Sequence, residues 1–339
     1  MDGVRRTEAE PAPVPSRFSM RRIPLELRKA AAVLGIAMLM AASFVAAYTV
    51  ALGQPFPRDM PVGVAGAAAD TAPLVAALHS RPSEFDVHEY PTRDAAIAAI
   101  NDQRITAAID ATASPPQLLL ASASDPSGTR VLTQLDQTQP GQFKLPIVDL
   151  YPLPPSDPAG LATFYLVIAA TLLGFTTMFQ LRANVKTLSL PRWLGCVAVL
   201  AVIGGAALAF VIGPVLHALT APFPELWLLV SLQIGIAATF NSAMLVLMHR
   251  WAIIPTWIVF ILLGNTSSGG AVSASLLPQP FAFLNHALPS GSTVSAIHTA
   301  AYFPHNQRAL PFIVLGLWLV ATLTALIVSA RKLGRSPAA

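Results

Sequence analysis

The residue types that carry most catalytic chemistry are present, but their spacing matches no catalytic motif. His88 and Glu89 begin a string typical of zinc proteases, yet Thr92 occupies the position of the second histidine. No glycine is followed directly by lysine, which excludes a phosphate-binding loop of the Walker A type. Ser292 and the serines of 267–275 lack the G-x-S-x-G context of a nucleophile elbow. The sequence therefore predicts no catalytic residue and no cofactor site, and it indicates that the chain is not an enzyme.

The metal-binding residue types are similarly scattered. Four histidines are expected on one face of the molecule, but their spacing matches no metal-ligand pattern; they are His217, His286, His298 and His305. The single cysteine, Cys196, lies within an apolar stretch, so neither a disulfide framework nor a cysteine metal site is expected. We expect surface histidines and no bound metal.

Polar residues inside apolar stretches are the candidates for a substrate path. Gln233, Thr239 and Asn241 bring amide and hydroxyl groups to the depth of a membrane. They would either line a path or make hydrogen bonds between helices, which is their commoner role.

A polar run also interrupts one apolar stretch early. From Trp251 only fourteen residues run to Gly264, roughly 21 Å at helical rise. Irregular backbone at that depth is tolerated only against protein or a water-filled cavity. The run would be either a gate or a frayed helix end, and it consists of Asn265, Thr266, Ser267, Ser268, Gly269 and Gly270.

Small residues recur at every fourth position of another apolar stretch, a spacing that lets two helices approach closely. The members of this ladder are Ala201, Gly205, Ala209 and Gly213. The ladder would form a dimer seam or would pack against another helix of the same chain.

The composition indicates that lipid is the solvent for most of the chain. Of its 339 residues, 54% are hydrophobic and 11% are charged, whereas soluble domains average about 25% charged. Most of the charge lies in residues 1–30 and 54–157. The net charge of +4 comes from basic residues that flank apolar stretches. Anionic lipid headgroups are their expected partners, and nucleic acid is not.

Six apolar stretches are long enough to be transmembrane helices. The first, 30–53, follows a basic tail at 1–29. A cleaved signal peptide is the alternative for this stretch, but it is longer than the usual apolar core of about 7–15 residues, so an uncleaved anchor is favoured. The later stretches belong to a helical region at 158–331, which precedes a short tail at 332–339; they are 161–181, 193–216, 226–248, 251 onward and 310–330.

Lysine and arginine counts predict the orientation of these spans. The segments expected on the cytoplasmic side hold seven lysines and arginines in the first tail, three at 182–192, one at Arg250 and three after residue 330. The short connections expected outside hold none at 217–225 and one, Arg308, at 265–309. We therefore expect a multi-pass protein of the plasma membrane with both termini in the cytoplasm.

The block 54–157 is predicted to be an extracytoplasmic α/β domain. Its alternating strands and helices indicate βαβ units around a small sheet. The strands are expected at 60–66, 85–90, 105–110, 117–122 and 145–150, and the helices at 71–80, 92–102 (with Thr92 as N-cap) and 127–137. The predicted fold class is an α-helical integral membrane protein with six transmembrane helices, and with this domain inserted between the first and second helices. Prolines within 271–288 predict short helices in an outer-face hairpin at about 265–309.

Three stretches resemble the permeases of type-2 ABC exporters, especially the branch of phage-infection-protein-like and nitrosoguanidine-resistance-like membrane proteins. Residues 92–110 resemble the helix and strand of that family's outer domain, where an A-x-x-A-I…I-x-A-A-I pattern recurs. Residues 149–160 resemble its proline-rich entry to the second span, and 264–304 resemble the segment before its last helix. The resemblance covers nearly the whole chain from residue 20.

The resemblance implies a homodimer or heterodimer that exports a drug, a lipid or a cell-envelope component, driven by a separate ATP-binding-cassette ATPase. It makes the inner loop the candidate ATPase-docking site, through Arg182, Lys186 and Arg192. That loop is short, which departs from the family pattern and weakens the expectation of ATPase coupling. No charged residue lies inside a predicted span. Because ion-coupled carriers usually keep such residues, an amphiphilic substrate and an external energy source are favoured.

The alternative is a surface protein that transports nothing and whose outer domain binds a partner, such as a phage or a secretion apparatus. The size of the outer domain and the thin cytoplasmic face favour this alternative.

Overall fold

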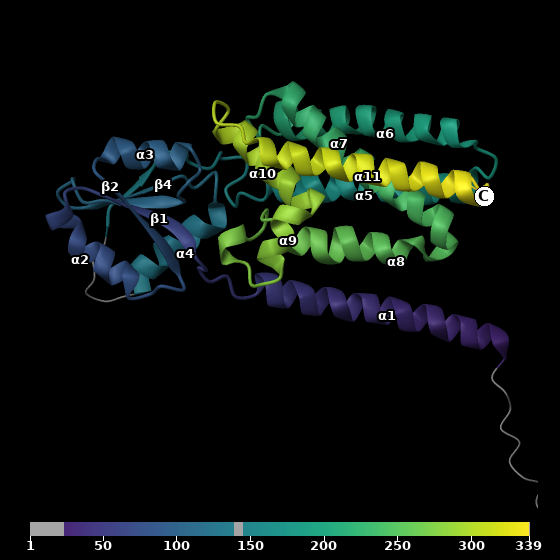
Figure 1. Cartoon of the computed structure of the whole chain (residues 1–339), viewed down its shortest axis with the longest axis horizontal. Helices are drawn as coiled ribbons and strands as arrows, with labels where there is room; N and C mark the ends of the chain where they lie inside the picture. The colour runs from purple at the N-terminus through teal and green to yellow at the C-terminus, as the bar shows by residue number, and fades with distance from the viewer. Residues whose placement is uncertain (1–23, 139–144, 339) are drawn as a thin grey trace, which may run out of the picture. The chain divides into compact units, whose positions relative to one another are not determined.

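The computed structural model describes residues 24–138 and 145–338 (Figure 1). Most of the basic tail predicted at 1–29 therefore lies outside the described residues. The chain divides into two units, Met1–Ser43 and Phe44–Ala339. The sheet, the later helices and every site considered below belong to the second unit.

Among the described residues, five helical stretches are long and apolar enough to cross a membrane. The first four begin with α1, α5, α6 and α7, and the last is α11. Their bounds are α1 (Leu25–Leu52), α5 (Ala162–Asn184), α6 with η1 (Leu190–Val215), the stretch that begins with α7 (Phe223–Asn265), and α11 (Ala309–Leu333). The two spans that the sequence predicted at 226–248 and from 251 onward form a single helical stretch of 43 residues.

This 43-residue stretch reverses direction at His249, whose φ of 55° is incompatible with a continuing helix. The hydroxyl of Thr256 donates to the Asn241 side-chain carbonyl at 3.0 Å, and the rings of Phe240 and Phe260 lie 5.4 Å apart. In a straight helix those two pairs would be separated by roughly 22 Å and 30 Å. The stretch is thus two adjacent legs (Figure 1); the first is α7 (Phe223–Met248), and the second comprises η2 (His249–Ala252), α8 (Ile253–Thr256) and η3 (Trp257–Asn265).

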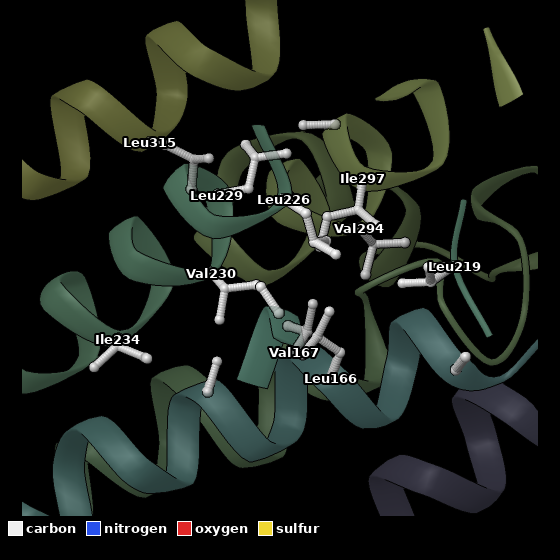
Figure 2. Close-up of a cluster of buried hydrophobic side chains, with 14 of the residues drawn as sticks. Leu166, Val167, Leu219, Leu226, Leu229, Val230, Ile234, Val294, Ile297 and Leu315 are labelled. Atoms are coloured by element: carbon white, nitrogen blue, oxygen red, sulfur yellow. The ribbon is translucent and has the colours of Figure 1, made fainter. Parts of the chain in front are cut away.

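Helix α7 is the centre of the helical region. Leu226, Leu229, Val230 and Ile234 belong to the buried cluster in Figure 2, which includes residues of α5, α10 (Pro289–Tyr302) and α11. Polar side chains of α7 add hydrogen bonds to its neighbours. Thr239 bonds Thr322 of α11 at 2.7 Å, and the indole of Trp193 in α6 donates to Ser242 at 2.8 Å.

Five strands, the first beginning at Met60 and the last ending at Asp149, form a mixed sheet in the order β2-β1-β3-β4-β5. Strand β1 runs parallel to β2 and β3, β3 is antiparallel to β4, and β4 is parallel to β5. The strands are β1 (Met60–Ala65), β2 (Phe85–Tyr90), β3 (Ala107–Asp110), β4 (Gln117–Leu120) and β5 (Ile147–Asp149), and the helices are α2 (Ala68–His79), α3 (Arg93–Asn101) and α4 (Pro126–Thr138).

Local signals explain most of these elements. The Thr92 hydroxyl accepts a hydrogen bond from the Ala95 backbone N–H at 3.2 Å, which caps α3 as predicted. The βαβ units β1-α2-β2 and β2-α3-β3 are confirmed by the parallel pairing of β1 with both β2 and β3. Strand β4 was predicted, but its antiparallel pairing with β3 was not, because a short apolar run does not reveal the direction of its pairing.

Short helices follow the second leg, as the prolines within 271–288 predicted. They are η4 (Ala274–Leu276), α9 (Phe281–Ala287) and α10 (Pro289–Tyr302). Pro289 occupies the first position of α10, where its missing N–H costs no intrahelical bond. Most of α10 is buried, and its core side chains Val294 and Ile297 join the cluster around α7.

Candidate functional site

The main candidate site is a cavity of about 240 Å³. It lies between the helices α9 and α10 and the sheet domain, which consists of the five strands with α2, α3 and α4. Its walls come from the sheet domain, from the turn after η3, from α9 and α10, and from the loop before α11. The residues that carry polar groups or the apolar wall are Ile100, Gln103, Ile105, Ser124, Asp125, Ser268, Gly269, Ser273, Asn285, His286, Val294, Ser295, His298, Phe303 and Arg308.

One side of the cavity is closed by side chains that cap the C-terminal end of α3. Asn306 donates through Nδ2 to the Asn101 carbonyl at 2.8 Å, and Arg308 donates to the Gln103 carbonyl at 2.8 Å. The Thr299 hydroxyl of α10 donates to the Gln103 side chain at 3.0 Å. Because the last carbonyls of a helix lack intrahelical partners, these bonds both end α3 and attach it to the helical region.

The other side is closed at the start of α4. The Ser273 backbone N–H donates to the Ser127 hydroxyl at 2.7 Å. The Asp125 carboxylate accepts from the Gly128 N–H at 2.8 Å, the bond expected of a residue that caps α4. Burial raises the pKa of Asp125, and hydrogen bonds from Gly128, Ser273 and Ser127 oppose that shift.

His298 projects from α10 into the cavity wall. Burial lowers the pKa of His298 to about 4, against smaller opposing effects from a hydrogen bond with the Ser124 backbone and from the charge of Asp157. The imidazole is therefore neutral at pH 7, with one ring nitrogen able to donate and the other able to accept a hydrogen bond.

The polar run predicted as a gate reaches this cavity at two positions. Ser268 and Gly269 line it. Gly269 has φ of +78°, and a Cβ there would lie 2.9 Å from Nδ2 of Asn285, so the turn requires glycine. Asn285 holds the same turn by donating to the Ser267 carbonyl at 2.8 Å.

The remaining residues of the run lie in the protein interior beside the cavity. The hydroxyls of Thr266 and Ser267 donate to the carbonyls of Leu262 and Leu263 one turn earlier. Among the described residues, the buried Asn265 Oδ1 has no hydrogen-bond partner. Gly270 packs against Phe164, because a Cβ at Gly270 would lie 3.0 Å from that side chain.

Gln233 and Asn241 do not line the cavity. Gln233 donates to the Thr171 hydroxyl of α5 at 2.7 Å and accepts from the Thr293 hydroxyl of α10 at 2.9 Å. Asn241 donates to the Phe175 carbonyl of α5 at 3.2 Å. These two amides make bonds between helices, which is the second of the two roles that the sequence left open.

The small-residue ladder packs largely within the chain. A Cβ on Gly205 would lie 2.1 Å from the Ser231 hydroxyl and 3.0 Å from the Ser231 Cα, so α6 and α7 are in close contact there. Ala209 is fully buried in the same cluster as α7. Ala201 lines a separate apolar groove of about 350 Å³ between α6, α7 and α11. A Cβ on Gly213 would be 3.8 Å from the nearest atom, a carbonyl oxygen.

The basic loop between α5 and α6 is only partly available to a partner. Arg182 donates to the Leu245 carbonyl near the end of α7 at 2.8 Å. Lys186 and Arg192 are exposed.

Several cavity residues were not predicted, including Gln103, Asp125 and Ser295. His286 and His298 were expected to be surface histidines, which is wrong for His298, because it is buried in the cavity wall. Nothing in their spacing could have revealed the cavity, because the segments that build it are far apart in the sequence.

Within the described part of the chain, no group of three or more His, Cys, Asp or Glu residues could hold a metal ion. No known family model, curated protein or solved structure matches this chain.

Proposed function

We propose that this chain is a permease subunit that exports an amphiphilic substrate, such as a drug, a lipid or a cell-envelope component. The two legs of the Phe223–Asn265 stretch count as two spans, which makes six. In this proposal both termini are cytoplasmic and the sheet domain lies outside the cytoplasm.

The observation that carries the proposal is the meeting of the cavity with the broken end of the second leg. Ser268 and Gly269, directly after that leg, line a cavity that also has the apolar side chains Ile105, Val294 and Phe303 in its walls. A site with both polar and apolar walls suits a molecule with both kinds of surface.

The flanking charges support the proposed orientation. Lys186 lies in the short connection between α5 and α6 and Arg192 lies in the first turn of α6, whereas the connection between η1 and α7 carries no lysine or arginine. Short loops rich in lysine and arginine favour the cytoplasmic side.

We further propose that the subunit works as a homodimer or heterodimer with a separate ATP-binding-cassette ATPase. The resemblance to type-2 exporter permeases supports this arrangement. The exposed Lys186 and Arg192 are the docking candidates, and Arg182 positions the loop by its bond to the Leu245 carbonyl.

The test is purification from native membranes, with ATP turnover and efflux of amphiphilic dyes measured in parallel. Replacing both Lys186 and Arg192 by glutamate is expected to remove the co-purifying ATPase and to abolish efflux. The matched control is Arg104→Glu, since Arg104 is an exposed residue of the sheet domain. Equal efflux from a strain that lacks the chain would overturn the proposal.

A second candidate is a surface protein whose sheet domain binds a partner. The observation that favours it is the bond between Arg182 and the Leu245 carbonyl, which turns one basic residue of the candidate docking segment toward the chain itself. This candidate predicts that an intact chain supports partner binding, such as phage adsorption, while dye efflux is the same with and without it.

A further inference from the structure

We propose that the cavity between the sheet domain and α10 binds the uncharged, hydroxyl-rich head group of an amphiphile. The inference rests on the proposed function, because it names the chemical class that the permease would recognise. It concerns binding alone, so it can be tested without any measurement of transport.

The cavity offers hydrogen-bonding groups that the chain itself does not use. Among the described residues, the Ser295 hydroxyl and the side-chain carbonyl of Asn285 make no hydrogen bond, although Asn285 does donate through Nδ2. The His298 ring lies in the same wall and is neutral at pH 7; one ring nitrogen bonds the Ser124 backbone, and the other is left to a ligand. A hydroxyl can both donate and accept, so a polyol is matched to this mixture of neutral donors and acceptors.

Fixed charges in the lining disfavour an anionic head group. Among the described residues of the lining, Asp125 carries the only side-chain carboxyl and Arg308 carries the only guanidinium. Arg308 already donates to the Gln103 carbonyl at 2.8 Å. A phosphate or sulfate would thus meet the guanidinium of Arg308, which already makes one hydrogen bond, and the carboxyl of Asp125. Sites that bind anions normally gather several cations instead.

A quaternary ammonium group is disfavoured for a different reason. Recognition of such a cation uses the faces of several aromatic rings. Phe303 is the only Phe, Tyr or Trp in the described lining. Together with Ile100 and Ile105, that ring instead forms an apolar wall against which the carbon face of a ring-shaped polyol can pack.

The experiment uses the full-length protein in lipid nanodiscs and an alkyl glucoside with a photoactivatable group beside the sugar. After illumination, adducts are mapped by proteolysis and mass spectrometry. We expect adducts within 268–274 and 289–302. Octyl glucoside should compete at concentrations at least tenfold lower than octyl sulfate or octyltrimethylammonium, which share its chain. Equal competition by all three compounds, or adducts confined to the apolar outer faces of the spans, would overturn the inference.

Two variants at one position test the assignment of the cavity. Ser295→Ala removes one neutral hydrogen bond and should weaken competition by octyl glucoside about fivefold. Ser295→Trp should fill the cavity and abolish the adducts. The matched control is Ser292→Ala, on the same helix but absent from the cavity lining, which should leave competition unchanged. If Ser292→Ala weakens competition as much as Ser295→Ala, the assignment is overturned.

The result for Ser295→Trp counts only if the variant unfolds at the same temperature as the parent. The comparison of Ser295→Ala with Ser292→Ala does not depend on it. Selective adducts in a protein that supports no efflux would support the proposed binding site and contradict the proposed permease function. Efflux without adducts at these segments would reject the binding site and keep the permease.

Discussion

At the scale of single residues, burial decides what each polar side chain can do. The side chains of Gln233 and Asn241 are fully buried, and each makes hydrogen bonds to two other segments of the chain. The Ser295 hydroxyl and one ring nitrogen of His298 lie in the wall of a cavity instead, so a ligand can reach groups that the chain leaves unused. The same amide or hydroxyl chemistry thus serves packing in one place and offers recognition in the other.

Replacing Gln233 by leucine tests the packing role. Gln233→Leu removes the bonds to Thr171 and Thr293, and hydrogen bonds between membrane helices average about 0.6 kcal/mol each. We expect a loss of roughly 1 kcal/mol of stability, measured as a lower midpoint of thermal unfolding. Gln180→Leu, at an exposed position of α5, is the control and should unfold like the parent. Lost efflux with an unchanged midpoint would instead place Gln233 on the substrate path.

His298 makes the stability of the protein depend on pH. Its pKa is about 4 in the folded chain and 6.5 in the reference state, so the unfolded chain takes up the proton first as the pH falls. Stability is therefore flat above about pH 6.5 and declines toward pH 4, by at most about 3 kcal/mol. Tryptophan fluorescence during heating should show this decline.

The matched variants are His298→Gln and His305→Gln, the second at an exposed position. The glutamine at 298 should remove most of the decline between pH 6.5 and pH 4, while the variant at 305 should retain it. Identical pH profiles for the two variants would contradict a buried, neutral His298. Asp125, whose pKa shifts upward, is present in all three proteins and cancels in the comparison.

At the scale of elements, close helix contact is achieved by small residues. Gly205 lets α6 approach the backbone of α7 at Ser231. Gly195 lies on the same helix, yet a Cβ there would meet nothing within 4 Å. A small residue in α6 therefore matters for packing only where it faces a neighbouring helix.

Replacing each of these two glycines by leucine distinguishes a ladder that packs within the chain from one that forms a dimer seam. Gly205→Leu should force α6 and α7 apart and cost about 1–3 kcal/mol, as overpacking does. Gly195→Leu should leave the unfolding midpoint of the purified protein unchanged. If Gly205→Leu instead lowers the yield of crosslinked dimer and leaves unfolding unchanged, the ladder is a seam between two copies.

At the scale of the whole molecule, the orientation of the chain decides whether an export model can hold. The sheet domain follows α1, and the helical region follows the sheet domain. If the domain lies outside, the cavity opens on the outer side. If it lies inside, the same cavity would face the cytoplasm, and the proposed direction of transport would fail.

Cysteine labelling in intact cells tests this orientation. The natural Cys196 is first replaced by serine, and a single cysteine is then introduced by Ser80→Cys in the sheet domain or by Thr187→Cys in the α5–α6 connection, both at exposed positions. A membrane-impermeant maleimide should label the first variant in intact cells and the second only after permeabilisation. Labelling of the Thr187→Cys variant from outside would reject both the topology and the export model.

The sequence by itself determined the features that depend on neighbours in the chain. Apolar stretches of sufficient length predicted helices that can cross a membrane, and short β-like runs predicted all five strands, including β2 at its observed bounds. The hydroxyl of Thr92 marked the start of α3, and the prolines marked the short helices before α11. These signals are local, because each arises from the backbone preferences and hydrogen bonds of a few consecutive residues.

Tertiary structure alone decided the pairing of Gln233 with two other helices and the cavity itself. The bond from Arg308 to Gln103 joins residues 205 positions apart, and that from Ser273 to Ser127 spans 146 positions. No local pattern encodes such pairs, since they form only when distant elements pack and bury their polar groups together. The candidate binding site is built from contacts of this kind, which is why the spacing of residues along the chain could not reveal it.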